Sequence, residues 1–228
     1  MISPSLSFIV TAAGEGSRFG VGQPKQFKKI NKIPIYIYSL LSINKINIKS
    51  EVFLTINKKI KIEKIEKELK TYGLSKVNVI HGGATRANSV YKAFTEIKNK
   101  KGYVVIHDSV RPNFDFRNLN GIIEKNKKFD GIIIASKIHD TVKRETKSIV
   151  KETLTRDELW LAETPQIFKY SILNKCYSNN LINDSYTDES QLLEKKGYKI
   201  KLYENIEYNN KITTKKDLII YKKLLSDV

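Results

Sequence analysis

A glycine-rich segment near the N-terminus combines a flexible backbone with permanent positive charge. Residues 12–20, AAGEGSRFG, follow the apolar run LSFIV, and Lys25 comes shortly afterwards. Gly14 and Gly16 allow the backbone to pass close to a ligand and to direct several N–H groups at an anion. Arg18 and Lys25 would then flank a triphosphate and neutralise charge as pyrophosphate departs. The segment therefore predicts a phosphate-binding loop rather than a tight turn with incidental surface cations.

Two better-known phosphate loops do not match this segment. The dinucleotide fingerprint has glycines spaced G-x-G-x-x-G, but position 19 is Phe. The P-loop ends in Gly-Lys followed by Ser or Thr, and this combination occurs nowhere in the chain. What remains is G-x-G-x-R followed by Pro-Lys, which excludes the dinucleotide and kinase-type loops but leaves the enzyme class open.

A second glycine block, GGATRANSV at 82–90, follows the apolar run KVNVI and opens a predicted helix. Gly82 and Gly83 allow the close approach of a base or a sugar, and Ser89 offers a hydroxyl. Arg86 can instead be a structural residue that pins neighbouring loops. By itself this block is only a moderate indication of a binding site.

The run VVIHDSVRP at 104–112 ends a predicted strand with an acidic residue. Asp108 is expected at the carboxyl edge of the sheet, where open α/β sheets bind ligands. One aspartate beside nucleotide phosphates is a common ligand of Mg²⁺, which keeps water in its other positions. Arg111 is placed to hold a second anion, whereas His107 is typical of a satisfied strand-end histidine. The three histidines of the chain lack the spacing of a zinc site.

Further polar blocks supply Thr, Arg and Lys, and we expect them in loops: DTVKR (140–144), LTRDELWLAETPQIF (154–168), TDES (187–190) and NNKITTKKDL (209–218). TDES also reads as a plain helix start, with Thr187 as N-cap and acidic residues in the first turn. Lys211 comes just before the last predicted helix and can reach a phosphate.

The elements that must position these residues alternate between strands and helices. Apolar runs predict strands at about 5–13, 51–57, 76–80, 102–108, 130–138 and 199–204. Segments with helical spacing lie between them or follow them, at about 34–46, 59–73, 86–98, 116–129, 169–181, 187–196 and from 214. This alternation predicts an α/β fold with a Rossmann-like, doubly wound, mostly parallel sheet covered by helices on both faces.

The alternation breaks at about 139–160. The β-branched, charged pieces DTVKRE and SIVKETL flank the turn-like TKS, which predicts an exposed hairpin. A hairpin alone is marginally stable, so this one is expected to pack on something, such as a second subunit. We find no internal repeat or low-complexity linker, and we expect residues 1–228 to form one domain with a protruding β-arm.

Composition narrows the setting. The chain has 228 residues, 40% of them hydrophobic, and no apolar run approaches the length of a membrane span. A single cysteine gives no disulfide framework, and the N-terminus does not read as a signal peptide, so a reducing, cytoplasmic setting is expected. The formal net charge is +17. It has two open interpretations: an attraction for phosphate-bearing ligands, or lysines accumulated on solvated helix faces.

Taken in order, seven blocks resemble the 2-C-methyl-D-erythritol 4-phosphate cytidylyltransferase family of non-mevalonate isoprenoid synthesis: AAGEGSRFG with PKQF, GGATRANSV, IHDSVRP, DTVKR, TRDELWLAETPQIF, TDES and NNKITTKKDL. The resemblance runs from about residue 8 to residue 222. It implies a nucleotidyltransferase fold, a homodimer joined by the arm, and a Mg²⁺-dependent reaction. CTP and methylerythritol phosphate would give diphosphocytidyl-methylerythritol and pyrophosphate.

The same resemblance implies a role for each matched residue. Arg18 and Lys25 match cations that stabilise the transition state, and Arg156 and Lys211 match residues that position the attacking phosphate. Asp108 falls on the metal-associated aspartate. Residues expected near the sugar phosphate, with those of the arm serving the neighbouring subunit, are Arg111, Thr141 and Thr164. Residues expected at the nucleotide are Ala12, Ala13, Gly14, Gly16, Gly83 and Ser89.

Two other functions stay open at this point. The form HDSVRP also occurs in the related ribitol-5-phosphate cytidylyltransferases, so CMP transfer to ribitol 5-phosphate is the alternative within enzymes. A non-catalytic, basic RNA-binding protein would explain the charge, but no recognised RNA-binding pattern is present. We therefore expect no nucleic-acid or membrane partner. A phosphate monoester is already largely a dianion at neutral pH, so this transfer needs no general base.

Overall fold

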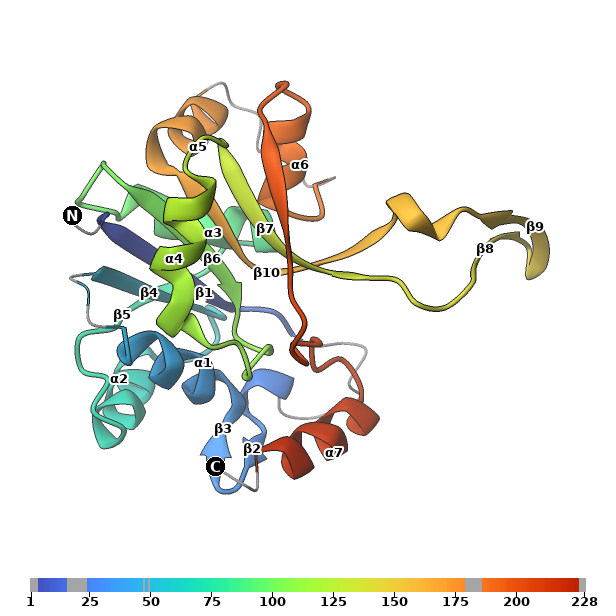
Figure 1. Cartoon of the computed structure of the whole chain (residues 1–228). Coiled ribbons are helices and arrows are strands. Elements are labelled where there is room, and N and C mark those ends of the chain that lie inside the picture. Colours follow the sequence, from blue (N-terminus) through green and yellow to red (C-terminus); the bar gives the residue numbers. More distant parts are fainter. Residues whose placement is uncertain (1–3, 16–23, 47, 49, 179–185, 226–228) are drawn as a thin grey trace.

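A computed structural model describes residues 4–15, 24–46, 48, 50–178 and 186–225 (Figure 1). At its centre is a seven-stranded sheet with the order β11-β7-β10-β6-β1-β4-β5. These strands are β1 (Leu6–Ala12), β4 (Ser50–Ile56), β5 (Asn78–His81), β6 (Tyr103–Asp108), β7 (Gly131–Lys137), β10 (Trp160–Lys169) and β11 (Ile200–Glu204). β1 pairs in parallel with β4 and β6, β4 with β5, and β7 with β11. The predicted mostly parallel sheet is confirmed.

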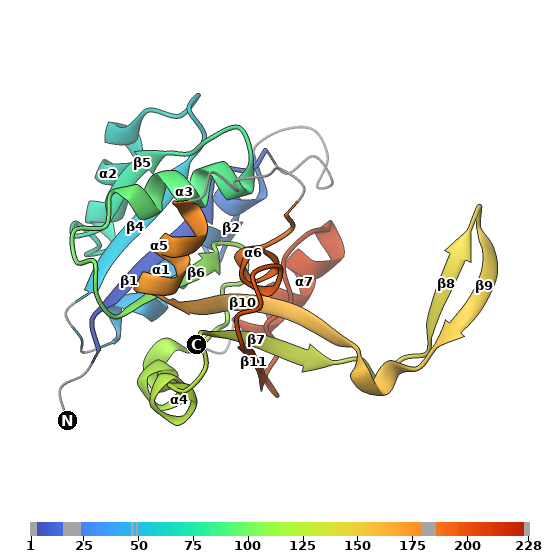
Figure 2. The same ribbon diagram turned by 90° about the horizontal axis from the view of Figure 1, so that it is seen from above.

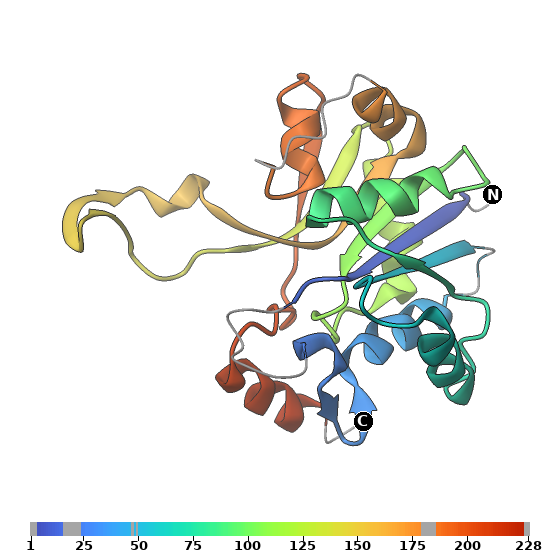
Figure 3. The same ribbon diagram turned by 180° about the vertical axis from the view of Figure 1, so that it is seen from behind.

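Helices cover both faces of this sheet. The helices α1 (Ile35–Asn44), α2 (Ile62–Thr71) and α4 (Leu119–Asn126) share one hydrophobic core with it, on the face toward the viewer in Figure 1. The helices α3 (Arg86–Thr95), α5 (Tyr170–Tyr177) and α6 (Glu189–Glu194) share a second core, on the face that Figure 3 shows. The doubly wound arrangement follows from this division.

β1 shows how the sequence produces the two cores. Phe8 and Val10 belong to the first core, whereas Ile9 between them belongs to the second. Successive side chains of a strand point to opposite faces, so a strand covered on both faces must be apolar at nearly every position. This is why the run LSFIV was recognisable as a buried strand.

The last helix, α7 (Lys215–Leu224), packs with the short strand β2 (Lys29–Ile30) in a third cluster, which includes Ile212 and Tyr221. β2 pairs with the short strand β3 (Ile33–Pro34). Thr214 and Asp217 form a capping box at the start of α7. This helix start holds the preceding segment, which carries Lys211, against the end of the sheet: the backbone N–H of Ile212 donates to the carbonyl of Val110.

β10 differs from the expectation that residues 154–168 form a polar loop. Its second half is a central strand, antiparallel to both β6 and β7. The polar residues Glu163, Thr164 and Gln166 lie in it, and its pairing with β7 shifts register between Ala162 and Gln166. Because these residues interrupt the apolar pattern, the sequence does not look like a buried strand there.

The segment between β7 and β10 carries the predicted hairpin, formed by β8 (Val142–Thr146) and β9 (Ile149–Leu154). Lys147 and Ser148 form its turn, both with positive φ. Figure 2 shows the hairpin set apart from the sheet and its helices. Exposure of Ile149 is 73% and that of Val150 is 61%, which is unusual for large apolar side chains on a short strand. No helix in the described ranges is long and apolar enough to cross a membrane.

Candidate active site

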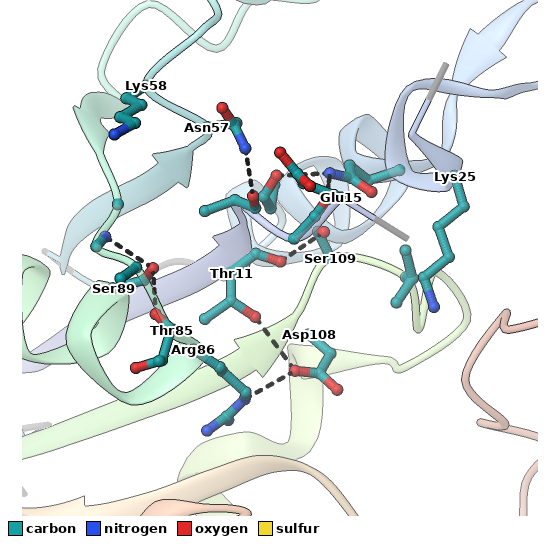
Figure 4. A pocket seen from close by; sticks show the side chains of 18 of the residues that line it. Thr11, Glu15, Lys25, Asn57, Lys58, Thr85, Arg86, Ser89, Asp108 and Ser109 are labelled. Atoms are coloured by element: carbon teal, nitrogen blue, oxygen red, sulfur yellow. Dashed lines mark hydrogen bonds and ion pairs between the residues drawn. The ribbon is translucent and has the colours of Figure 1, made fainter. Parts of the chain in front are cut away.

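The cavity lies where the order of the strands reverses. From β1 the chain adds β4 and β5 on one side of it and then returns to place β6 on the other side. In open α/β sheets, the crevice at the carboxyl ends of the strands beside such a reversal binds ligands. Residues that follow β1, β4, β5 and β6 line a cavity of about 590 Å³ here (Figure 4). This volume is in the range of small-molecule and cofactor sites.

The first glycine segment is held by a buried glutamine. The side-chain amide of Gln26 donates to the carbonyls of Ala12 and Gly14, at 2.7 Å in each case. Asn57, which follows β4, donates to the carbonyl of Ala13 at 3.3 Å. The backbone that leaves β1 is therefore fixed from two sides, and Lys25 of the adjoining 3-10 turn (Lys25–Phe27) extends into the same cavity.

The second glycine segment forms a tight turn into α3. A Cβ on Gly82 would lie 2.6 Å from the Ser89 Oγ and 2.7 Å from the Ala13 Cβ. The Ser89 hydroxyl accepts from the Gly83 N–H at 3.0 Å and donates to the Thr85 carbonyl at 2.8 Å. Glycine is thus required here by the packing of the two turns on each other, and Ser89 first of all shapes the wall of the cavity.

Asp108 ends β6 on the cavity wall, and three cations surround its carboxylate. Oδ2 lies 2.7 Å from the Lys211 Nζ and 4.0 Å from the Arg111 Nε. Oδ1 lies 3.4 Å from the Arg86 Nε and accepts from the Thr11 hydroxyl at 3.2 Å. Burial alone would raise the pKa of Asp108, but Lys211, Arg86 and Arg111 together hold it well below its usual range. Asp108 is therefore ionised at neutral pH.

A buried hydrogen-bond chain fixes the backbone of Asp108. Its N–H donates to the Thr164 hydroxyl at 3.0 Å, and that hydroxyl lies 3.1 Å from the Nδ1 of His107. The His107 Nε2 lies 3.0 Å from the carbonyl of Arg111. Only the tautomer with its proton on Nε2 satisfies all three groups, with Thr164 donating to Nδ1. Burial lowers the pKa of His107 to about 4, so the ring is neutral, as expected for a satisfied strand-end histidine.

Arg86, the first residue of α3, bridges two carboxylates. Its Nη1 donates to both oxygens of Glu189, at 2.8 and 3.0 Å, while its Nε faces Asp108. Glu189 is 3% exposed and begins α6. Burial raises the pKa of Glu189, and Arg86 opposes this shift. The interpretation of Arg86 as a residue that pins neighbouring elements agrees with these contacts.

Eight of the predicted site residues line the cavity together: Ala12, Ala13, Gly14, Lys25, Gly83, Ser89, Asp108 and Lys211. Arg111 lies behind Asp108, and its Nη1 donates to the carbonyl of Asn209 at 2.7 Å. Thr164 is buried beneath Asp108 rather than on the cavity wall. Gly16 and Arg18 lie outside the described residues.

The other two predicted residues, Thr141 and Arg156, do not line this cavity. Both are exposed residues of the segment that carries the hairpin. Arg156 begins a 3-10 turn (Arg156–Glu158) and donates to the carbonyl of His139. In this structure the two residues do not contribute to the cavity of their own chain.

The side chains at the cavity can hold a metal ion only if other molecules supply most of its ligands. In the described part of the chain, no group of three or more His, Cys, Asp or Glu side chains could hold a metal. Asp108 offers a single carboxylate, and that carboxylate is already paired with cations. Mg²⁺ bound by one carboxylate takes its other ligands from phosphates and water. The residues therefore fit a Mg²⁺ ion that arrives with a nucleotide, and not a metal site built by protein alone.

Sequence reasoning missed two residues that hold the walls of the cavity in place, Gln26 and Glu189. Gln26 lies beside the predicted Lys25, and a buried amide next to a glycine loop leaves no periodic signal. Glu189 lies in the block TDES, and its partner Arg86 is 103 positions away. TDES and the glycine block that carries Arg86 were both among the candidate site segments. Nothing in the sequence indicates that these two segments contact each other.

Comparison with known proteins agrees with this architecture. The family model described as 2-C-methyl-D-erythritol 4-phosphate cytidylyltransferase matches residues 6–227. An enzyme of that name from Wigglesworthia glossinidia brevipalpis is 37% identical over 218 residues, which are 94% of this chain and 93% of that protein. A solved structure of the Francisella tularensis 2-C-methyl-D-erythritol 4-phosphate cytidylyltransferase has a TM-score of 0.78 at 34% identity. It covers 97% of this chain and 100% of the other.

Some relatives are longer. A protein named bifunctional enzyme IspD/IspF from Pelagibacter ubique is 34% identical over 212 residues, which are 92% of this chain but 55% of that protein. The chain thus spans about half the length of the bifunctional relatives it matches. The family match extends through the cavity, the hairpin and α7. This chain belongs to the 2-C-methyl-D-erythritol 4-phosphate cytidylyltransferase family.

Proposed function

We propose that this chain transfers CMP from CTP to 2-C-methyl-D-erythritol 4-phosphate. The products are 4-diphosphocytidyl-2-C-methyl-D-erythritol and pyrophosphate, and the reaction belongs to isoprenoid precursor biosynthesis. The observation that carries the proposal is the grouping of Lys25, Asp108 and Lys211 around one cavity behind a glycine loop, in a chain that matches this family from residue 6 to residue 227.

The proposed reaction needs little acid–base catalysis from the protein. The phosphate oxygen of the acceptor attacks the α-phosphorus of CTP, the bond to the β-phosphate oxygen breaks, and pyrophosphate leaves with its charge. A phosphate monoester is largely a dianion at neutral pH, so no residue has to remove a proton. The neutral, fully enclosed His107 fits this mechanism because it offers no free nitrogen to a ligand.

The work left to the protein is to align two anions and to neutralise their charge. Lys25 and Arg18 are proposed to neutralise the departing pyrophosphate, and Lys211 with Arg156 to position the attacking phosphate. Arg111 and Thr141 are proposed near the sugar phosphate. Thr164 is proposed there too, although its hydroxyl lies under Asp108. The residues proposed to bind the nucleotide are Ala12, Ala13, Gly14, Gly16, Gly83 and Ser89.

Asp108 is the residue proposed to hold Mg²⁺, together with the nucleotide phosphates. When bound, Mg²⁺ supplies positive charge next to the phosphates and orients them for displacement. The carboxylate suits this role because it is ionised and faces the cavity. Thr164 and the other partners of Asp108 keep the carboxylate in place.

The active assembly is proposed to be a homodimer joined by the hairpin, in which the arm of one copy brings Thr141 and Arg156 to the cavity of the other. Support comes from the exposed Ile149 and Val150, whose apolar surface a partner would cover. The whole chain is proposed to act as one domain, in a reducing, cytoplasmic setting.

Pyrophosphate release tests the proposed function. The purified chain is incubated with CTP and Mg²⁺ and with either methylerythritol 4-phosphate or ribitol 5-phosphate. We expect release with the first acceptor and little with the second. Pyrophosphate release only with ribitol 5-phosphate would identify the chain as a ribitol-5-phosphate cytidylyltransferase instead. No release with either acceptor, combined with salt-sensitive RNA binding, would overturn the enzymatic assignment.

A further inference from the structure

Glu189 is a buried carboxylate that does not line the cavity and that the mechanism above does not use. Arg86 separates it from Asp108: the two oxygens of Glu189 accept from the Arg86 Nη1, and the Nε of the same guanidinium faces the Asp108 Oδ1 at 3.4 Å. One permanently charged side chain is therefore shared by two carboxylates from different elements, the end of β6 and the start of α6.

Two hydrogen bonds of Asp188 fix the start of α6 and therefore the position from which Glu189 binds Arg86. Asp188 caps the helix by accepting from the Gln191 N–H at 3.0 Å. Gln166 of β10 donates to the other Asp188 oxygen at 2.7 Å. β10 also carries Thr164, which accepts the Asp108 N–H. The same strand thus anchors the backbone of Asp108 and the helix that presents Glu189.

In this cluster the cations outnumber the carboxylates. Asp108 and Glu189 face the three cations Arg86, Arg111 and Lys211. A carboxylate that already has strong cationic partners attracts a further cation weakly, and a positive surplus opposes Mg²⁺ directly. An arginine cannot lose its proton in a protein, so without Glu189 its charge would act more strongly on its other ion-pair partner, Asp108.

We propose that Glu189 is a positioning residue for Asp108: it binds one side of Arg86 and thereby limits how strongly Arg86 pairs with Asp108, so that Asp108 stays available to a metal ion delivered with nucleotide phosphates. This inference rests on the proposed nucleotide chemistry, but it concerns binding and not the identity of the acceptor. Removing the charge of Glu189 raises the metal concentration that nucleotide binding requires.

The test measures CTP binding by calorimetry while Mn²⁺ or Mg²⁺ is varied, with no acceptor present. In Glu189→Gln we expect the metal concentration for half-maximal CTP binding to rise by roughly 10–100-fold, the usual effect of removing an outer partner of a metal ligand. Glu189→Asp keeps the charge but draws it back, so it shifts the value in the same direction by a smaller factor. Glu194→Gln, at the exposed end of the same helix, leaves the value unchanged and controls for effects on α6.

A double variant shows whether the effect passes through Arg86. Once Arg86 is replaced by Gln, adding Glu189→Gln should change the metal requirement little, because the residue through which Glu189 acts is gone. A metal requirement that stays at the wild-type value in both Glu189→Gln and Glu189→Asp overturns the proposal, even if thermal stability falls. So does a full shift that persists without Arg86.

If Glu189→Gln does not fold, the comparison of Glu189→Asp with the wild type decides by the same measure. The outcome is separate from that of the proposed function. Wild-type protein that binds CTP with metal but releases no pyrophosphate with any acceptor refutes the proposed transfer and leaves this inference standing. Pyrophosphate release together with an unchanged metal requirement in the Glu189 variants supports the proposed transfer and refutes this inference.

Discussion

The Nζ of Lys211 lies 2.7 Å from the Oδ2 of Asp108, although 103 positions separate the two residues in the sequence. Sequence reasoning assigned them to different partners, Lys211 to the acceptor phosphate and Asp108 to the metal. In the structure each is the counter-ion of the other. Changes at either residue should therefore alter two binding events at once, and in opposite directions.

Replacing Lys211 by Ala tests this coupling. We expect kcat/KM for the acceptor to fall by about 10²–10³-fold, because a cation aimed at the reacting phosphate is lost. At the same time CTP binding should need less metal, because one competitor of the metal at Asp108 is gone. Pyrophosphate release and metal-dependent calorimetry measure the two effects. Lys215→Ala, an exposed lysine nearby, should change neither, and a Lys211→Ala enzyme with a higher metal requirement would contradict the coupling.

The cations of the glycine loop are expected to act on turnover rather than on folding. Lys25→Ala and Arg18→Ala should each lower kcat by roughly 10²–10³-fold, while the thermal midpoint changes little, because the lost interaction forms mainly in the transition state. Lys29→Ala, an exposed position a few residues further on, is the matched control. Near-wild-type turnover in both variants would sink the assignment of this loop.

The hydroxyl of Thr164 should be worth more to stability than an ordinary surface hydroxyl. Thr164→Val leaves the buried Asp108 N–H without an acceptor and His107 Nδ1 without a donor. We expect the free energy of unfolding to fall by about 1–3 kcal/mol in denaturant titrations. Thr164→Ser keeps the hydroxyl and should retain most of that stability. A Thr164→Val variant as stable as the wild type would show that these hydrogen bonds do not stabilise the fold, and a loss in Thr164→Ser would measure the contribution of the methyl group.

His107 should make the protein less stable in mild acid. Burial holds its pKa at about 4 in the folded state, against an ordinary value of 6.5, so between these values only the unfolded chain takes up the proton. The free energy of unfolding should therefore fall as pH drops from about 6.5 to 4, by about 3 kcal/mol in all. Asp108, whose pKa is lowered, should lose its contribution only at more acidic pH. Urea titrations across this range measure the slope.

Two variants test whether His107 causes this dependence of the free energy of unfolding on pH. His107→Gln should flatten it, whatever its effect on overall stability, because no titrating ring is left in the buried position. His139→Gln, at an exposed position before the hairpin, should leave it as in the wild type. A slope that survives in His107→Gln would assign the acid sensitivity to another group.

Mixed dimers test whether one copy completes the cavity of the other. Lys25→Ala and Arg156→Ala chains carrying different affinity tags are expressed together, and doubly tagged dimers are isolated. If Arg156 acts across the dimer, each mixed dimer has one intact cavity and one with both defects. It should then give about half of the wild-type turnover, as the two-fold symmetry of a homodimer requires. Mixed dimers as inactive as the parents would place Arg156 at the cavity of its own chain, and an Arg156→Ala parent with wild-type turnover would place it outside the mechanism.

Much of the sheet could be predicted because its strands are buried on both faces. Runs such as LSFIV and GIIIA are apolar at nearly every position, which is typical of strands buried on both faces. β10 could not be predicted in the same way. Glu163 accepts from Asn209 at 2.8 Å and Gln166 donates to Asp188, so polar residues occupy the middle of a central strand to bind loops far away in sequence. Their partners become visible only in three dimensions.

The candidate site, like the sheet, could be predicted from the sequence only in part. Asp108 and the two glycine segments were predictable because the carboxyl ends of parallel strands converge on one edge. The pairing of Arg86 with Glu189 was not, because an ion pair between two helix starts leaves no spacing in the sequence. The hairpin was evident from its turn and its charges, whereas the distance of Thr141 and Arg156 from the cavity depends on where the hairpin points.

The place of β10 in the sheet also sets the order in which the protein can be built. β1, β4, β5 and β6 pair with one another, so this half of the sheet can form while the ribosome is still making the rest. In the described sheet, β7 pairs only with β10 and β11, both of which are synthesised after it. Asp108 emerges early, but Thr164, Glu189 and Lys211 follow it by 56, 81 and 103 residues. Arg86 and Arg111 are made before or just after Asp108, but its other cation, Lys211, comes near the end of the chain. The cavity therefore acquires its final charge balance only when the last tenth of the chain is made.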